Sequence, residues 1–194
     1  MFEIFYPYEY VESVFSIDYK KLIKLGYKGL IFDIDNTLVH HGEDSTREVD
    51  ELFKKIQNMG LKTIILSNNS EKRVKKFLEN IDSLYIFDAQ KPKKINYLKS
   101  IDMLELNKNE VVVIGDQIFT DIFGANKSGI SSILVKYLRK SESEKIGKKR
   151  RVEKFILNFY KKNNFKEISI RKNYYSEPTE NAIIMKLEVN VNNE

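Results

Sequence analysis

Cysteine is absent from the 194 residues, and histidine occurs only twice, at His40 and His41. Without cysteine the chain has no disulfide framework and no thiolate to act as a nucleophile or a metal ligand. Any bound metal must therefore be held by oxygen atoms or by these two histidines. Oxygen ligands indicate a hard cation.

Long apolar runs are also missing. No stretch approaches the apolar length needed to cross a bilayer, and the first ten residues lack a basic segment followed by an apolar one. We therefore expect a cytoplasmic protein, with peripheral contact at the inner face of the membrane as the alternative. Neither an internal repeat nor a low-complexity linker is visible, and the length predicts one domain with an appendage.

The formal net charge of +5 is unevenly distributed, because basic residues crowd positions 136–154. The cations of this basic stretch are Lys136, Arg139, Lys140, Lys145, Lys148, Lys149, Arg150, Arg151 and Lys154. Two interpretations stay open. The stretch is a solvated loop, or it attracts anionic lipid headgroups, for which each cation near the surface contributes about 1 kcal/mol.

Short apolar runs alternate with helical patterns from about residue 28. Strands are predicted at 29–32, 62–66, 84–87, 111–114 and 132–135, and helices at 49–59, 72–78, 93–103 and 118–127. The strand segments are continuously apolar, which is typical of strands covered on both faces. The pattern predicts an α/β fold with a doubly wound, Rossmann-like parallel sheet.

The two ends of the chain are different in pattern. Residues 10–25 have apolar residues at mixed spacing and predict a short packing segment without chemistry. A last helix is predicted from apolar residues at helical spacing, namely Val152, Phe155, Ile156, Phe159 and Tyr160. Residues 165–194 alternate apolar and polar positions around a turn at 177–181, so we expect a main domain over 1–164 and a C-terminal β-hairpin appendage over 165–194.

Polar residues follow four of the predicted strands, at the sheet edge where open α/β folds bind ligands. Asp33 and Asp35 end the first strand and share one side if the strand geometry persists. Two carboxylates roughly 4 Å apart repel by about 4 kcal/mol at an effective dielectric near 20. A bound Mg²⁺ would remove that cost.

The second strand runs into Ser67, Asn68, Asn69 and Ser70. By themselves these residues favour a helix cap, with a phosphate cradle at a helix N-terminus as the functional alternative. The third strand end carries Lys91 before Pro92, and Pro92 is well placed for the first turn of the next helix. Lys91 is either a solvated charge or a partner for phosphate oxygens.

The fourth strand ends in Gly115 and Asp116, followed by Asp121. Gly115 permits a tight turn, and Asp116 would complete a cation site. For Asp121 three interpretations stay open: it orients a metal-bound water, pairs with Lys91, or merely lies in the first turn of the next helix.

The order Asp33-x-Asp35-x-Thr37, Ser67, Lys91-Pro92 and Gly115-Asp116 with Asp121 resembles the four motifs of the haloacid dehalogenase (HAD) superfamily, over about residues 28–136. The Asp-Asn-Thr and Gly-Asp-Gln variants are similar to the subfamily IIIA phosphatases, within them to the YqeG and phosphatidylglycerophosphatase-like group. Arg150-Arg151-Val152-Glu153 resembles that group's Asn-Arg-x-x-Glu, although a basic residue replaces the asparagine and Tyr137 replaces the usual proline.

The resemblance implies a Mg²⁺-dependent phosphatase with an aspartyl-phosphate intermediate. Asp33 would be the nucleophile and Asp35 the general acid and base. The implied metal ligands are the Asp33 side chain, the Asp35 backbone carbonyl and Asp116. Other implied roles are phosphate binding for Ser67, Asn68 and Lys91, and supporting positions for Thr37 and Asp121.

The segments 38–62 and 70–84 leave no room for the cap domain that many superfamily members carry, so we expect an open, capless site. His40 and His41 are interpreted as part of its rim, not as metal ligands. An open site suits a large substrate, such as phosphatidylglycerophosphate at a membrane surface, or covering by a second subunit. The alternatives are a soluble nucleotide, a sugar phosphate or a nucleic-acid terminus, the last less favoured, and a non-catalytic phosphate-binding regulatory module.

Overall fold

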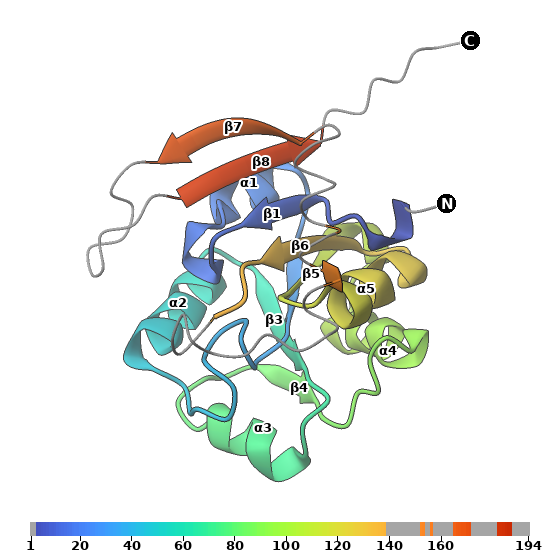
Figure 1. The fold of residues 1–194 in the computed structure, drawn as a ribbon. Helices are drawn as coiled ribbons and strands as arrows, with labels where there is room; N and C mark the ends of the chain where they lie inside the picture. The colour runs from blue at the N-terminus through green and yellow to red at the C-terminus, as the bar shows by residue number, and fades with distance from the viewer. Residues whose placement is uncertain (1–2, 139–151, 154–155, 157–164, 172–181, 188–194) are drawn as a thin grey trace.

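The structure is a computed structural model, and it describes residues 3–138, 152–153, 156, 165–171 and 182–187, the last two ranges as backbone only. Its centre is a sheet in the strand order β4-β3-β2-β5-β6-β1-β8-β7 (Figure 1). The strands are β1 (Glu9–Val11), β2 (Gly29–Phe32), β3 (Lys62–Leu66), β4 (Leu84–Ile86), β5 (Val111–Gly115), β6 (Ser131–Val135), β7 (Phe165–Arg171) and β8 (Ala182–Leu187).

The six strands from β4 to β1 pair in parallel, whereas β8 pairs antiparallel with both β1 and β7. The predicted α/β class and parallel sheet are therefore confirmed. The two central strands, β2 and β5, are in register from Gly29 opposite Val111 to Phe32 opposite Ile114. This register brings the residues that follow the two strands to the same edge of the sheet.

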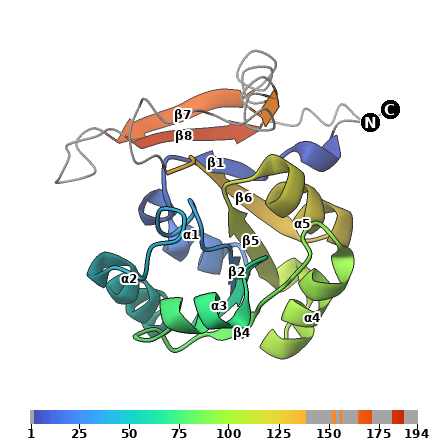
Figure 2. The ribbon, with the colours of Figure 1, turned by 60° about the horizontal axis from the view of Figure 1, so that its bottom comes forward.

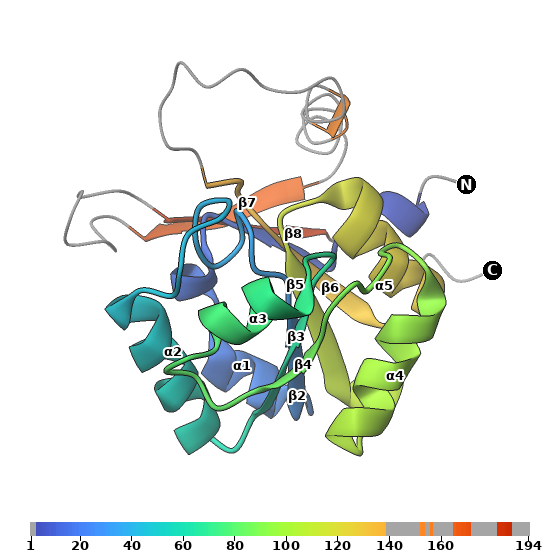
Figure 3. The ribbon, with the colours of Figure 1, turned by 90° about the horizontal axis from the view of Figure 1, so that it is seen from below.

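Helices cover both faces of the sheet. In Figures 2 and 3 the helices α1, α2 and α3 lie on one side of the strands, and α4 and α5 lie on the other. The helical segments are η1 (Glu3–Phe5), η2 (Val14–Ser16), α1 (Tyr19–Lys24), α2 (Arg47–Asn58), α3 (Glu71–Phe77), α4 (Lys94–Leu104), η3 (Lys108–Glu110), η4 (Ile118–Ile122) and α5 (Phe123–Ser128).

The core follows from the alternation of side chains along each strand. Leu30 and Phe32 pack with α1, α2 and α3 in one apolar cluster, while Ile31 packs with α4 and α5 in a second. Both sets are fully buried, which explains why the β2 sequence is continuously apolar. The two clusters hold the strand ends rigidly from both sides, and this positions the site.

Three elements differ from the sequence expectations. The segment expected only to pack contributes β1, which lies parallel to β6 inside the sheet. Pro92 precedes α4 instead of lying in its first turn, because α4 begins at Lys94. The helix expected over 118–127 begins as one π-helical turn, η4, and becomes α-helical only at Phe123.

The C-terminal expectations are partly described. The hairpin exists as β7 and β8, but it extends the main sheet through β1 instead of standing apart. Of the last predicted helix, Phe155, Phe159 and Tyr160 lie outside the described residues, and the described Val152 is 50% exposed. Val152 therefore does not belong to a core face, which corrects that part of the expectation.

The connections at the site edge are short. Residues 33–61 contain α2 and residues 67–83 contain α3, with loops and no further domain between the strands, so the capless architecture is confirmed. Within the residues that the structure describes, no helix is long and apolar enough to span a membrane.

Candidate active site

Asp33 is the first residue beyond β2, and its backbone N–H donates to the Ile114 carbonyl of β5 at 3.0 Å. This hydrogen bond continues the pairing of the two central strands, so the backbone at Asp33 is fixed by the sheet itself. The residue is 8% exposed. A carboxylate is thus held at the centre of the sheet edge, where polar groups of neighbouring strand ends converge.

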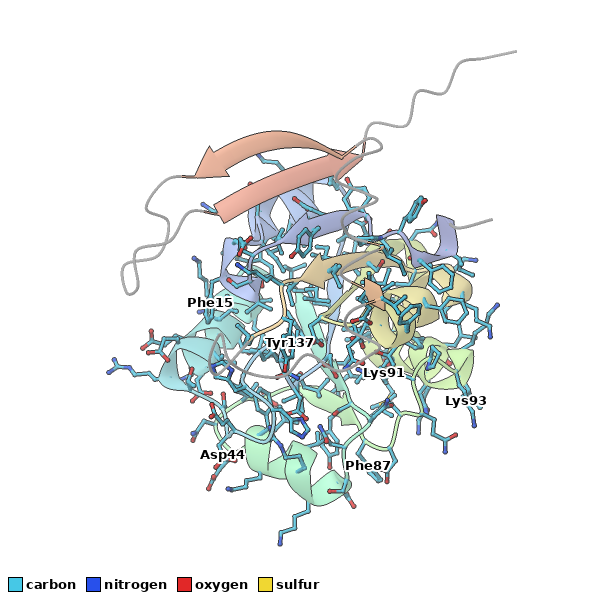
Figure 4. All side chains as sticks on the ribbon, in the orientation of Figure 1. Phe15, Asp44, Phe87, Lys91, Lys93 and Tyr137 are labelled. Carbon is cyan, nitrogen blue, oxygen red and sulfur yellow. The ribbon has the colours of Figure 1, made fainter. Side chains whose placement is uncertain are left out.

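Lys91 reaches the same point from the segment between β4 and α4. The backbone of this segment passes through the left-handed region at Asp88 (φ 44°) and Gln90 (φ 51°), and the Lys91 N–H donates to Asn68 Oδ1 at 2.7 Å. Figure 4 shows Lys91 towards the middle of the molecule and Lys93 at its outer edge. The loop conformation therefore turns Lys91 inward.

The Lys91 ammonium bridges two buried carboxylates. Its Nζ lies 2.5 Å from Asp33 Oδ1 and 2.7 Å from Asp121 Oδ1, and the Lys91 side chain is 4% exposed. Of the three interpretations of Asp121, the structure supports pairing with Lys91. One ionised carboxylate balances the buried ammonium, so the trio carries one excess negative charge when both carboxylates are ionised.

Asp116, the residue after β5, completes a cluster with Asp33 and Asp121. Carboxylate oxygens of the three residues all lie within 4.8 Å of one another, and all three residues are buried. Lys91 contacts only Asp33 and Asp121 of the three among the described residues, so the cluster gathers negative charge when its carboxylates are ionised. A divalent cation with oxygen ligands, such as Mg²⁺, fits this donor set in both charge and chemistry.

Thr37 and Gly115 shape the cluster. The Thr37 hydroxyl lies 3.2 Å from both Asp33 Oδ2 and Asp116 Oδ1, so it can donate to either carboxylate. A Cβ at Gly115 would lie 2.4 Å from Asp121 Cγ, which no real structure tolerates. Gly115 is therefore required for the close approach of Asp121, whose Oδ2 also accepts from the Gln117 N–H at 3.0 Å.

The pKa values in the cluster depart from their usual ranges. Burial raises the pKa of Asp33 to about 6, although Lys91 opposes that rise and Asp121 adds to it. For Lys91, burial alone would lower the pKa, but Asp121 and Asp33 raise it above its usual range. Lys91 is therefore a permanent cation, and Asp33 is easier to protonate than an ordinary aspartate.

Asp35 lies apart from the carboxylate cluster. Its Oδ1 accepts from the Gly42 N–H at 3.0 Å and from Arg73 at 3.1 Å, and its Oδ2 accepts from Asn69 Nδ2 at 2.6 Å. Burial alone would raise the pKa of Asp35, but these hydrogen bonds and the charges of Arg73 and His41 hold it below its usual range. The side chains of Asp33 and Asp35 thus do not share one partner set, contrary to the simple strand geometry.

The segment after β3 also differs from the expectation in detail. Ser67 is fully buried, and its hydroxyl accepts from the backbone N–H of Asn69 at 3.2 Å and from Asn69 Nδ2 at 2.9 Å. Asn68 is exposed and braces Lys91, as described above. Ser70 precedes α3, but its side chain makes no capping hydrogen bond. The helix-cap interpretation is therefore wrong for this side chain.

The sequence indicated no role in the site for four residues that lie near it. Asn69 and Arg73 contact Asp35, and the Tyr97 hydroxyl donates to the Thr120 carbonyl at 2.9 Å inside η4. The buried Glu153 accepts from the Phe119 N–H at 3.4 Å. Asn69 was within a motif already noticed, and Glu153 was noticed for its resemblance, but nothing in the sequence distinguished Arg73 from the neighbouring surface lysines.

The chain belongs to the haloacid dehalogenase-like hydrolases, whose family model matches residues 39–135. That match begins after Asp33 and Asp35 but includes Ser67, Lys91, Asp116 and Asp121. The protein is 37% identical to the Bacillus subtilis protein named "Probable phosphatase YqeG" over 161 residues, which are 82% of this chain and 94% of the relative.

Solved structures similar to this chain share low identity. A Listeria monocytogenes protein is 20% identical with a TM-score of 0.49, covering 69% of this chain and 99% of its own. A Brucella suis hydrolase of the haloacid dehalogenase-like family is 12% identical with a TM-score of 0.45, covering 66% of this chain and 92% of its own. The family match and the curated relative confirm the predicted superfamily and the predicted enzyme class, a phosphatase of the HAD type.

Proposed function

We propose that the protein is a Mg²⁺-dependent phosphatase that hydrolyses a phosphate monoester through an aspartyl-phosphate on Asp33. The observation that supports this most directly is the burial of Asp33 between Lys91 and the carboxylates of Asp116 and Asp121. A phosphate dianion approaches such a carboxylate only if a metal and an ammonium offset its charge. A bound Mg²⁺ would supply that charge and polarise the phosphoryl oxygens.

We propose residue roles that agree with this placement. The metal would bind Asp33, Asp116 and the Asp35 backbone carbonyl, while Asp121 and Thr37 keep the cluster in position. Lys91 contacts the Asp33 carboxylate directly, so its ammonium would also bind a phosphoryl oxygen there. With the buried Ser67 and the exposed Asn68 it would complete the phosphate site.

Turnover then needs two proton transfers. In the first step Asp35 would give a proton to the leaving oxygen as the P–O bond breaks, and in the second it would take one from the attacking water. A residue held ionised by Gly42, Asn69 and Arg73 is well suited to the second step.

The test replaces the nucleophile. Asp33→Asn is expected to lower Mg²⁺-dependent hydrolysis of p-nitrophenyl phosphate by at least about 10³-fold, since nucleophile loss removes the covalent route. Asp44→Asn is the matched control, because Asp44 is an exposed carboxylate paired with Lys76 at 2.7 Å. Full activity of pure Asp33→Asn protein would refute the proposal, and inactivity of the wild-type protein on every phosphate ester would favour a non-catalytic phosphate-binding module.

The substrate that we favour is phosphatidylglycerophosphate, as in the subfamily IIIA group to which the motifs are similar, and the alternative is a soluble phosphate ester. The short loops around the site support a large substrate. In the basic stretch, the described Lys136 pairs with Glu12 at 2.6 Å, and residues 139–151 lie outside the described ranges. Activity that depends on anionic liposomes would favour the lipid, and equal activity on soluble esters without them would favour the alternative.

A further inference from the structure

The Asp35 carboxylate lies in a cluster of hydrogen-bond donors that come from three separate segments. Besides the hydrogen bonds from Gly42, Asn69 and Arg73, His41 Nδ1 lies 3.4 Å from Asp35 Oδ2. Gly42 and His41 belong to the loop after β2, Asn69 follows β3, and Arg73 lies on α3. Donors converging from distant parts of a chain on one point form a binding site for an anion.

The cluster has more N–H donors than the Asp35 carboxylate uses. Arg73 Nε and one of its terminal nitrogens are buried and have no hydrogen-bond partner among the described residues. The other terminal nitrogen donates both to Asp35 and to the Glu43 carbonyl. Buried N–H groups without acceptors are costly, so the cluster has capacity for an anion with more oxygen atoms than a carboxylate.

The cluster also surrounds the carboxylate that we propose to protonate the leaving oxygen of a substrate. Asp35 follows Asp33 by two residues. The side chains of Asp35 and Arg73 are 13% and 16% exposed, and that of His41 is 76% exposed, so the cluster is open to solvent on one side. Lys76, on the same helix as Arg73, is engaged with Asp44.

We infer that Gly42, Asn69, Arg73 and His41 form a subsite for a second anionic group on the leaving part of the substrate. This inference rests on the proposed phosphatase function. The group is a phosphodiester or a similar oxyanion. In the structure the Asp35 carboxylate occupies the subsite, and the substrate's anion would replace it there.

The replacement has a consequence for catalysis. Once the second anion takes the donors, Asp35 is released from them and can turn towards the leaving oxygen. Substrates with the second anion therefore bind better and react faster, whereas esters without it must release Asp35 unaided. Arg73 is the key donor, because it carries a permanent charge and two buried nitrogens without an acceptor among the described residues.

The test compares two alkyl esters that differ only in the second anion: propyl phosphate, and propyl phosphate with a methyl phosphodiester on the third carbon. For the wild-type protein with Mg²⁺, we expect kcat/KM to be at least about tenfold higher for the phosphodiester-bearing ester, the gain from one charge-assisted contact. An ester with a trimethylammonium group on the third carbon should be no better than propyl phosphate.

Variants assign the preference to the subsite. Arg73→Met should reduce the ratio of the two kcat/KM values to within about twofold of one, and Arg73→Lys should give an intermediate ratio. Lys72→Met, which removes an exposed cation from the adjacent position of α3, should keep the wild-type ratio. If Arg73 had a merely structural role, Arg73→Met would lower kcat/KM equally for both esters. A kcat/KM ratio unchanged in Arg73→Met would overturn the inference.

The outcomes separate the two proposals. If the wild-type protein hydrolyses both esters equally well, the subsite is refuted while the phosphatase function stands. If neither ester nor p-nitrophenyl phosphate is hydrolysed with Mg²⁺, the proposed function itself fails. A diacylated version of the phosphodiester-bearing ester, presented in mixed micelles, then distinguishes the source of the anion. A higher kcat/KM for the diacylated ester than for the soluble one identifies a lipid headgroup, and a lower value identifies a soluble metabolite.

Discussion

At the scale of single residues, the ionised Asp33 carboxylate destabilises the folded state. Its pKa is raised to about 6, from an ordinary value near 3.9, because burial disfavours its ionised form. The folded protein therefore binds more protons than the unfolded chain between about pH 4 and 6. Stability from this group is present below that window and is lost as the pH rises through it.

The prediction concerns metal-free protein in EDTA. Asp33→Asn should raise the free energy of unfolding above pH 6, by up to about 3 kcal/mol for a shift of two pKa units, and the gain should shrink towards pH 4. Urea unfolding at pH 4.5 and 7.5 measures it. The exposed Asp44→Asn variant should show no such pH-dependent gain, and a destabilised Asp33→Asn protein at pH 7.5 would contradict the argument.

The motif residues were the most predictable part of the site. Asp33 and Asp116 directly follow buried apolar strands, and parallel strands bring such ends together, whereas Lys91 reaches the same edge from the loop after β4. The surroundings of Asp35 were not predictable, because Gly42, Asn69 and Arg73 meet it through the tertiary fold of two loops and a helix. A local pattern contains no signal for contacts of that range.

At the scale of elements, η4 sets the position of Asp121. Its π-helical turn lies between β5 and α5, and such turns are frequent at functional sites. Tyr97 of α4 donates to the Thr120 carbonyl, and a Cβ at Gly124 would lie 2.5 Å from the Tyr97 ring. The turn is thus held by close contacts that leave Asp121 little freedom.

Gly115→Ala tests this arrangement. The added Cβ must displace Asp121, so we expect activity to fall by about 10–100-fold and stability by about 1–3 kcal/mol. Gly29→Ala is the matched control, since its Cβ would meet the flexible end of Leu106 at 2.6 Å, at the opposite end of β2. It should affect thermal stability but not kcat/KM; a Gly115→Ala enzyme with wild-type kcat/KM would show that Asp121 need not stay in place.

Elements were predictable in proportion to their periodicity. The central strands and α2 were placed within a residue or two, because long apolar runs and helical spacing are strong signals. The strand β1 was missed because it has only three residues, Glu9–Val11, and its place is decided by pairing with β6, far along the chain. The π-helical start of the fifth helix has no periodic signature at all.

At the scale of the whole molecule, the carboxylate cluster makes stability depend on the metal. With Mg²⁺ at about 100 times its dissociation constant, binding to the folded state alone contributes about 2.7 kcal/mol, which raises Tm by about 5–10 °C. Differential scanning calorimetry with Mg²⁺ and with EDTA measures the shift. Asp116→Asn, which removes one of the three clustered carboxylates, should lose most of it, and an equal shift in that variant would exclude Asp116 as a ligand.

The C-terminal hairpin is predicted to be dispensable for chemistry. Its strand β8 pairs with β1 at Glu9 and Tyr10 and lies four strands away from β2, the strand that Asp33 follows. A chain ending at residue 164 should keep p-nitrophenyl phosphate hydrolysis within about threefold and lose about 1–3 kcal/mol of stability. Loss of Mg²⁺-dependent activity in a truncated protein that still melts cooperatively would assign the hairpin to the site.

The place of β1 sets an order on the assembly of the sheet. This strand comes first from the ribosome, yet its parallel neighbour β6 ends only at Val135 and its other neighbour β8 begins at Ala182. More than a hundred residues must be synthesised before Glu9–Val11 can pair, so the segment waits unpaired while β2 to β5 collapse around their helices. The hairpin contacts the rest of the sheet through β1, so its place in the sheet depends on the pairing of Glu9–Val11.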